Sequence, residues 1–428
     1  MIFALVLSII TIALMIVTII KFPKLNIGKV QLQTFWIIPF ISTLIVLIFK
    51  LIDFNSVKEG LLSDTSVNPI KILILFFSMT FMSIVLDEFG FFEYLANLAL
   101  KKAKSSQIKL FITLYVLTSI LTVFTSNDII ILTFTPFIIF FTKSAKINPI
   151  PYLVSEFVAA NTWSMMFIIG NPTNIYLATS FNLSFLEYFL KMIVPTFLGG
   201  LSSFTILYLI FRKELKKDLE IEIKEVKITN RFLVITNLVL LIICTIFLVI
   251  SSYIGLEMYL IALTCASIML IILIIYSLSI RMTIYLKEAL KRLPYSLIPF
   301  LISMFIIVLT DESYGITGKI TELLARGDSI LMYGTTSTLM CNLINNIPMS
   351  VLYSSIIPLG NIKALYSTII GSNIGAFLSP IGALAGIMWL SILKKHDVKY
   401  SFIDFVKYGV IVVIPTLIMA LVGLYIVL

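Results

Sequence analysis

The sequence predicts an all-α polytopic membrane protein, and its composition and the spacing of its apolar runs are the observations that predict it. Of the 428 residues, 60% are hydrophobic and 12% are charged, with a mean hydropathy of +1.09. Such a chain has too little polar surface to cover a water-soluble globule. Charge-free runs long enough to cross a hydrocarbon core of about 30 Å recur along the whole chain, so we expect about 10 spans. The clearest runs are residues 1–20, 30–49, 72–86, 232–256 and 258–280.

The charged residues gather between the apolar runs and predict an orientation in the membrane. The net charge is +9, and the basic clusters should face the cytoplasm. The clusters lie at 21–29, 101–109, 143–146, 212–231, 281–292 and 394–399. The first run has neither a basic start nor a cleavage site, so we interpret it as a retained span with an outside N-terminus. This charge pattern indicates membrane topology and not nucleic-acid binding.

Two segments begin and end on the same predicted side, so each should be a re-entrant hairpin. The segment 110–142 is flanked by basic clusters on both sides, and the segment 329–358 by none. The first hairpin should therefore enter from the cytoplasm and the second from outside. The acidic pairs Asp87-Glu88 and Asp311-Glu312 precede the two hairpins at span ends, where acidic residues are ordinarily hydrated.

A single acidic residue stands inside the first hairpin segment. Asp128 is the only charged residue between positions 110 and 142, and it follows Thr125, Ser126 and Asn127. A charge at membrane depth costs from about 2.5 kcal/mol upward and is normally kept where it handles an ion or a substrate. This position predicts a transport protein. The alternative is a buried structural carboxyl group that is protonated or hydrogen-bonded to a neighbouring helix.

The chain repeats one unit in inverted orientation. The motif Ser-Phe-Leu-Glu-Tyr at 184–188 matches Ser-Phe-Ile-Asp-Phe at 401–405, and each is followed by an apolar run that contains Pro-Thr. The loop before the first motif is uncharged, whereas the loop before the second is basic, which indicates inversion. We therefore divide the chain into repeat 1 at 1–212, a cytoplasmic linker at 213–231 and repeat 2 at 232–428. Inverted repeats are typical of secondary transporters, whose substrate site lies between the repeats.

Each repeat has a span that should be broken near its middle. The first contains Asn161-Thr162 and then Gly-Asn-Pro-Thr-Asn at 170–174, and the second contains Gly-Ser-Asn-Ile-Gly at 371–375 and then Ser-Pro-Ile-Gly at 379–382. Glycine and proline both favour unwinding there. Unwound backbone is tolerated in a membrane only when it is buried in protein or lines a wet cavity. The alternative is a set of proline kinks that only pack.

The candidate substrate- and ion-binding residues belong to the two hairpin tips and the two broken spans, and we expect the tips around Asn127 and Asn345 to meet the helix breaks in one cavity near the midplane. They are Thr125, Ser126, Asn127, Asp128, Asn161, Thr162, Gly170, Asn171, Pro172, Thr173, Asn174, Asn345, Asn346, Ser372, Asn373, Ser379 and Pro380. Freed carbonyl groups and amide oxygens suit a small cation, such as sodium at the hairpin tips, and helix N-termini suit an anion or a polar neutral solute. The three cysteines have no metal-site spacing, and no Walker A, nucleophile-elbow or HExxH motif is present. We therefore expect no enzyme activity, no cofactor and no other metal.

Several of these motifs resemble the arsenical-pump membrane protein family. The resemblance covers the chain from about residue 70 onward and rests on the motifs at 86–93, 124–136, 345–348, 371–373 and 379–382. That family belongs to the ion transporter superfamily, together with citrate and dicarboxylate carriers and sodium/proton exchangers. The resemblance implies a central site between two inverted repeats, an elevator-like motion in a homodimer, and export of arsenite or antimonite in exchange for protons. The partners implied are a small anionic or neutral oxyacid, a coupling proton or sodium ion, and the lipid bilayer of the cell membrane.

The chain also departs from that family pattern. In the arsenite exporters an Asp commonly stands where this chain has Asn161 and Asn373, and a Pro-Lys pair where it has Ala376-Phe377. The segment 170–174 is more similar to the dicarboxylate carriers. A sodium-coupled dicarboxylate or citrate carrier and a sodium/proton antiporter are therefore the alternatives. We expect the side chains of Asn161 and Asn373 to face the cavity.

Overall fold

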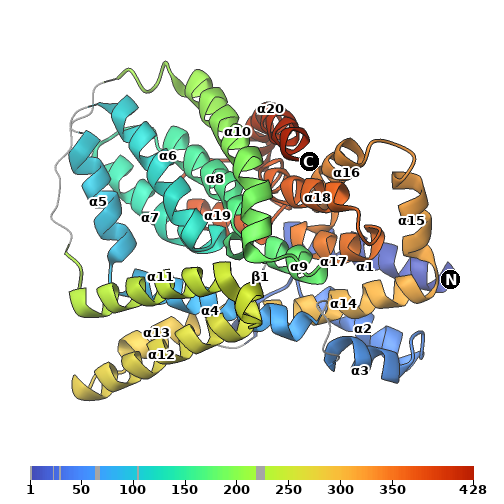
Figure 1. Ribbon diagram of the computed structural model, residues 1–428. Helices are drawn as coiled ribbons and strands as arrows, with labels where there is room; N and C mark the ends of the chain where they lie inside the picture. The colour runs from blue at the N-terminus through green and yellow to red at the C-terminus, as the bar shows by residue number, and fades with distance from the viewer. Residues whose placement is uncertain (1, 23, 28–29, 63–67, 104–105, 218–226) are drawn as a thin grey trace.

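The computed structural model is almost entirely helical (Figure 1). It describes residues 2–22, 24–27, 30–62, 68–103, 106–217 and 227–428. The described residues form 20 α-helices, three short 3-10 helices and one antiparallel pair of strands, β1 (Lys24–Ile27) and β2 (Val30–Gln33). The predicted linker at 213–231 lies partly outside the described residues, and the boundaries of the two repeats stay a prediction.

The helices occur in the same order in both halves of the chain. The first half contains α1 (Ile2–Lys21), α2 (Ile37–Ile48), α3 (Phe54–Leu62), α4 (Pro69–Glu88), α5 (Phe91–Ala103), α6 (Gln107–Phe124), α7 (Asn127–Ser144), α8 (Ile150–Trp163), η1 (Ser164–Met166), η2 (Ile168–Gly170), α9 (Pro172–Ser180) and α10 (Phe185–Phe211). The second half contains α11 (Arg231–Ile254), α12 (Met258–Ser279), α13 (Ile284–Lys291), α14 (Leu297–Ser313), α15 (Ile316–Leu324), α16 (Ser329–Ile344), α17 (Asn346–Ile356), α18 (Ile362–Ile374), η3 (Gly375–Phe377), α19 (Leu384–Lys395) and α20 (Phe402–Val427). Each half thus has two leading helices, two short helices around a long one, a hairpin, a broken span and a long final helix.

The number of helices that can cross a membrane is close to the prediction. Among the described residues, eight helices are long and apolar enough, and the pair α14 and α15, bent by 82°, makes a ninth. The prediction that residues 30–49 form one continuous span is wrong, because Val30–Gln33 is a strand and α2 has only 12 residues. At 1.5 Å per residue, α2 is about 18 Å long, which is shorter than a hydrocarbon core. Polar Gln31, Gln33 and Thr34 precede this helix and explain its late start.

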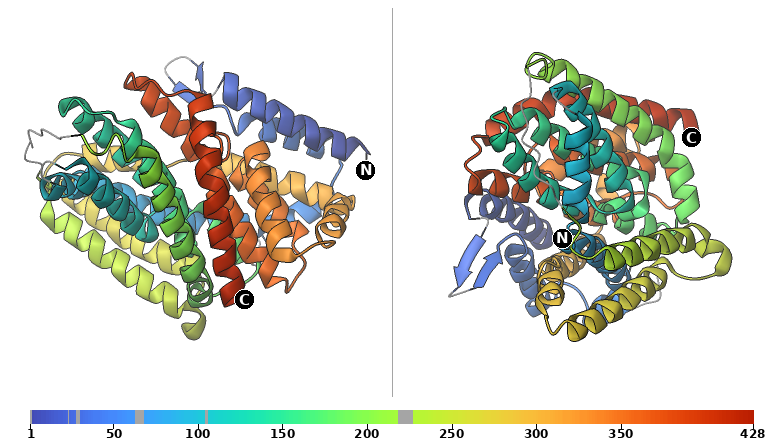
Figure 2. Two further views of the ribbon diagram at one scale, coloured as in Figure 1. Left: turned by 90° about the horizontal axis from the view of Figure 1, so that it is seen from above. Right: turned by 90° about the vertical axis from the view of Figure 1, so that its left-hand side faces the viewer.

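The matching sequence motifs of the two repeats are helix start signals. The hydroxyl of Ser184 accepts a hydrogen bond from the N–H of Glu187 at the start of α10, and that of Ser401 accepts one from Asp404 at the start of α20. Both are N-caps, which satisfy backbone donors that a helix leaves free. The helices α10 and α20 pack side by side (Figure 2), with Gly423 against the backbone of Pro195. The repeat motif therefore positions the two long helices that pack together.

Both predicted hairpins are present as two helices joined at a short break. The break between α6 and α7 is Thr125 and Ser126, and the break between α16 and α17 is Asn345 alone. Asn345 has φ +72° and ψ 154°, a backbone region that is essentially restricted to glycine. The second tip is therefore a tight and strained turn, whereas the first uses two residues with negative φ, of which Ser126 is extended.

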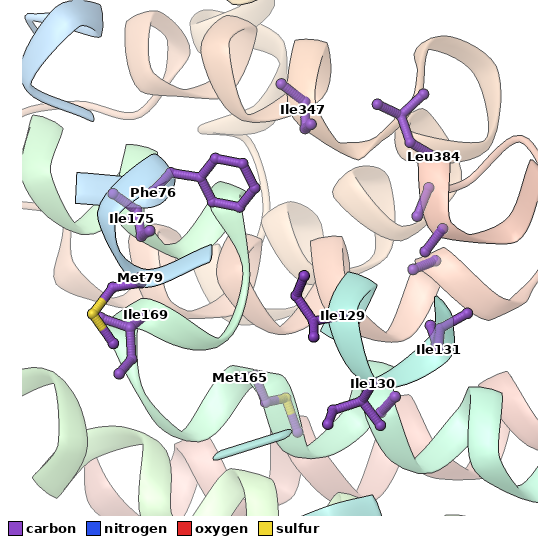
Figure 3. Close-up of a cluster of buried hydrophobic side chains, with 14 of the residues drawn as sticks. Phe76, Met79, Ile129, Ile130, Ile131, Met165, Ile169, Ile175, Ile347 and Leu384 are labelled. Carbon is purple, nitrogen blue, oxygen red and sulfur yellow. The ribbon is translucent and has the colours of Figure 1, made fainter. Parts of the chain in front are cut away.

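The helices form two groups that meet at the site (Figure 1). The scaffold, defined here as α1–α4 and α11–α14, packs against a second group, the core group, formed by α6–α10 and α16–α20. Figure 3 shows apolar side chains from α4, α7, α9 and α19 that converge between the groups, among them Phe76, Ile129, Ile175 and Leu384. The two hairpin tips and the two broken spans all belong to the core group.

Candidate functional site

The tip of the first hairpin carries buried oxygen atoms with no partner. Ser126 is the N-cap of α7, but its side chain makes no capping hydrogen bond. Within the described residues, the Ser126 Oγ and the Asn127 Oδ1 are buried and have no hydrogen-bond partner. The Asn127 Nδ2 donates to the Asn161 Oδ1 at 3.0 Å, which docks the tip against the end of α8. Because buried polar groups are nearly always hydrogen-bonded, the two free oxygens indicate a place for a ligand or an ion.

Asp128 follows directly in the first turn of α7, where the helix N-terminus favours a negative charge. The residue is half-buried, and the described part of the chain supplies neither a hydrogen bond nor an ion pair to its carboxylate. It lines a cavity of about 500 Å³ together with Ser126 and with Thr80 of α4. The structural alternative can take the form of a hydrogen bond from a neighbouring helix, and no such bond is found among the described residues.

The other wall of this cavity belongs to the scaffold and is basic. It includes Lys291, the last residue of α13, Arg292, which caps that helix, and the segment that leads into α14. The guanidinium of Arg292 donates from Nη1 to Glu88 and from Nη2 to Asp87, both at 2.5 Å. Burial alone would lower the pKa of Arg292, but the two carboxylates outweigh burial and raise that pKa above its usual range, so Arg292 stays charged.

The sequence predicts that the acidic pairs at the span ends are hydrated. In the structure, each of these four carboxyl groups instead has a side-chain partner. Asp87 and Glu88 hold Arg292, with about 15% of each side chain exposed. In the second half, Asp311 is buried and accepts a hydrogen bond from Ser8 of α1, and Glu312 accepts one from Ser355 of α17. Their partners come from helices that are distant in sequence, so composition around the pairs could not reveal them.

The first broken span unwinds at the predicted residues. Helix α8 ends at Trp163, two 3-10 turns follow, and α9 begins at Pro172 with Asn171 as its N-cap. A Cβ atom at Gly170 would lie 2.2 Å from the carbonyl oxygen of Ser164, so this position accepts only glycine. Pro172 stands at the first helical position, where its missing N–H is harmless. The predicted break at Gly170 and Pro172 is confirmed.

An amide network joins the two broken spans. The Asn373 Oδ1 accepts hydrogen bonds from the Ser164 hydroxyl at 2.8 Å and from the Asn171 Nδ2 at 3.0 Å. The Asn373 Nδ2 donates to the Asn174 Oδ1 at 2.7 Å. Next to this hub, the hydroxyls of Thr173 and Ser372 lie 3.2 Å apart. All of these side chains are almost completely buried, so the network fixes α9 against α18.

The expectation that Asn161 and Asn373 face the cavity is wrong. Both side chains are completely buried, and neither lines the cavity beside Asp128. The reason is chemical: a carboxamide both donates and accepts, so two or more amides can satisfy one another inside the protein. Thr162 is also buried, and its hydroxyl has no hydrogen-bond partner among the described residues.

The second hairpin tip is bound to the second break. The Asn345 Nδ2 donates to the carbonyl of Ile381, and the backbone N–H of Asn346 donates to the carbonyl of Gly382, each at 3.0 Å. The Ser379 hydroxyl donates to the Asn342 Oδ1 at 2.7 Å. Ser379 and Pro380 lie between η3 and α19, as predicted for a break. The tip does not line the cavity beside Asp128, so the expectation of one cavity shared by both tips is wrong.

The predicted break at Gly371 is also wrong. Gly371 lies inside α18, and a Cβ atom there would be 2.0 Å from the Ser337 Oγ and 2.6 Å from the carbonyl oxygen of Gly334, both on α16. This glycine allows two helices to approach closely, and the helix unwinds one turn later, at Gly375. Sequence alone cannot separate these two uses of glycine, because both need a residue without a side chain.

Three further residues contribute to the site and were not among the predicted ones. Asn342, one turn before Asn345, donates to the carbonyl of Gly375 at 2.9 Å, and Ser164 belongs to the amide network. Glu156 of α8 is buried, and both of its carboxylate oxygens lie 3.0 Å from the Thr135 hydroxyl of α7. A polar residue inside an apolar helix is the signal that could have identified all three.

The comparison with known proteins agrees with this architecture. The model of the family described as "Arsenical pump membrane protein" matches residues 7–428. An Escherichia coli protein of that name is 24% identical over 370 residues, which cover 82% of this chain and 84% of the relative. A Bacillus subtilis relative described as a "Putative arsenical pump membrane protein" is 27% identical over 384 residues, which cover 80% of this chain and 84% of the relative.

A solved structure shares the fold. The crystal structure of the Alcanivorax borkumensis YdaH transporter covers 99% of this chain, and the chain covers 97% of it, with a TM-score of 0.56 and 11% sequence identity. At this identity the likeness concerns the fold alone. Together with the apolar helices, these relatives indicate a multi-pass membrane transporter.

Proposed function

The chain belongs to the arsenical pump membrane protein family, and from this premise we propose that it is a secondary active transporter of a small oxyacid of the arsenite type. Transport would proceed by alternating access, with the core group moving relative to the scaffold. By family resemblance the motion would be elevator-like and the protein a homodimer. The cavity between the two groups would hold the solute.

One observation carries this proposal: a carboxylate that has no partner among the described residues lines a solute-sized cavity between two groups of helices. Asp128 is the only charged residue between positions 110 and 142, and the cavity beside it has a volume of about 500 Å³. A fixed structural charge at such a depth would normally have a partner. A carboxylate that is left free suits a group that binds and releases a cation during each cycle.

The coupling ion would bind at the first hairpin tip. The Ser126 Oγ and the Asn127 Oδ1 are buried acceptors without partners in the described residues, and both residues directly precede Asp128 in sequence. Hard oxygen ligands of this kind suit sodium, and a carboxylate alone suits a proton. Both ions fit the proposal, and the coupling ion is therefore part of its test.

The dicarboxylate or citrate carrier remains the alternative for the substrate, and a sodium/proton antiporter is the second. The Asn-rich segment 170–174 favours the first alternative in sequence. In the structure, however, Asn171 and Asn174 bind Asn373, so these amides are not free to hold a carboxylate. The free oxygens at the first tip are the observation that favours an antiporter.

Flux measurements with purified protein in proteoliposomes test the proposal. We would impose either a proton gradient or a sodium gradient and measure arsenite, succinate and proton fluxes in each case. Arsenite flux driven by the proton gradient is the expected result. Succinate flux driven by sodium, without arsenite flux, would replace the proposal with the carrier. Sodium/proton exchange with neither solute moving would replace it with the antiporter.

A further inference from the structure

The cationic wall of the cavity has a feature that the proposed function does not use. Arg292 lines the cavity and forms ion pairs with two carboxylates, those of Asp87 and Glu88. About 31% of its side chain is exposed, so the guanidinium is not sealed inside the scaffold. A purely structural ion pair would not need to stand at the edge of a cavity that also contains Asp128.

The hydrogen-bonding capacity of Arg292 is only partly used. A guanidinium has five N–H donors in a fixed plane. Two of them bind Glu88 and Asp87, and the described part of the chain offers no partner to the other three. The two carboxylates therefore fix the orientation of the guanidinium, and the remaining donors are left for a solute in the cavity.

The charge of this cluster selects the kind of solute. One positive charge stands between two negative ones, so Arg292, Asp87 and Glu88 together carry a net charge of −1. Asp128 adds another negative charge at the cavity, whereas the positive charge of Lys291 is paired with Glu288 at 3.5 Å. A multiply charged anion would meet repulsion here, while an uncharged oxyacid could still accept hydrogen bonds from Arg292.

We propose that Arg292 is a substrate-binding residue that donates hydrogen bonds to an oxygen of a neutral or singly charged oxyacid, and that Asp87 and Glu88 make the site reject multiply charged anions. This inference rests on the proposed function and assigns its selectivity to three named residues. It also gives a role to the Asp87-Glu88 motif, which lies far from both hairpins in sequence.

Two variants and a control test it in proteoliposomes that contain the full chain. Arg292→Gln should raise the KM for arsenite about tenfold or more with little change in kcat, which corresponds to the loss of one charge-assisted hydrogen bond. Asp87→Asn combined with Glu88→Gln leaves the cation without its counter-charges and should make succinate a stronger inhibitor of arsenite uptake. Arg281→Gln, an exposed substitution in the same basic cluster that does not line the cavity, is the matched control and should behave as wild type.

Equal KM values for arsenite in wild type, Arg292→Gln and Arg281→Gln would overturn the assignment. If the wild type transports no arsenite, the proposed function fails, and a thermal-shift titration of purified protein with arsenite then decides the role of Arg292. Stabilisation by arsenite that is lost in Arg292→Gln supports the inference. Stabilisation that is equal in both proteins, or absent from both, contradicts it.

Discussion

The two hairpin tips occupy equivalent places in the two halves, but they are bound to the protein in different ways. The second tip, at Asn345 and Asn346, is held by the carbonyl groups of Ile381 and Gly382. The first tip has one docking bond, from Asn127 to Asn161, and leaves Ser126 and Asp128 at the cavity. The same hairpin arrangement therefore occurs in both halves, but the second tip is bound to the protein, whereas the first tip is open to a ligand.

Substitution of Asp128 should have the largest effect. Asp128→Asn keeps the shape of the side chain but removes its charge, so we expect coupled transport to be abolished while the thermal midpoint stays near that of the wild type. Glu322→Gln removes an exposed acid of α15 that does not line the cavity and serves as the control. Fluxes in proteoliposomes and unfolding in detergent measure the two quantities. Wild-type flux through the Asn variant would show that the first tip is as structural as the second.

Substitution of Asn373 should mainly affect stability. Asn373→Asp replaces two donated hydrogen bonds, to Asn174 and to the carbonyl of Ile369, with repulsion between oxygens at a completely buried position. We expect the free energy of unfolding to fall by about 3 kcal/mol or more. Asn182→Asp, in an exposed loop, is the control. Equal thermal midpoints for the two variants would show that the amide network does not hold the broken spans together.

The strain at the second tip predicts a smaller effect that depends on the replacement. Asn345→Ala loses the bond to Ile381 and keeps the unfavourable φ of +72°, whereas Asn345→Gly loses the bond but removes the strain. We expect the alanine variant to be less stable than the glycine variant by about 1–3 kcal/mol. The difference in their thermal midpoints measures it. A glycine variant that is the less stable of the two would contradict a strained tip.

Replacement of Glu156 by Gln should give the smallest effect. Glu156→Gln can still accept a hydrogen bond from Thr135, so we expect the free energy of unfolding to change by less than about 1 kcal/mol. Glu156→Ala leaves the Thr135 hydroxyl without this partner and should cost about 2 kcal/mol more, through the lost bond and the cavity it creates. Thermal unfolding of both variants separates the two cases. If the Gln variant is stable but loses proton coupling, Glu156 would be a second functional acid in the first half of the chain, beside Asp128.

Sequence by itself determined the membrane class, the order of elements and the places where helices begin and break. Periodic apolar runs set the spans, Ser184 and Ser401 set the helix starts, and Gly170 and Pro172 set the first break. These features are local: a cap or a break depends on the backbone within a few residues. The span at 30–49 and the break at Gly371 failed because a short helix and a close helix contact look the same as a span and a break in sequence.

Only the tertiary structure decided which polar residues face the cavity. Asn161, Asn373 and Asp128 are all polar residues in apolar surroundings, and nothing in the sequence says which of them face the cavity. The structure shows that the amides bind other amides, whereas the carboxylate has no partner among the described residues and lines the cavity with Arg292, a residue 164 positions later in the chain. The physical reason is that hydrogen-bond satisfaction depends on atoms brought together by folding, and no local pattern records those distances.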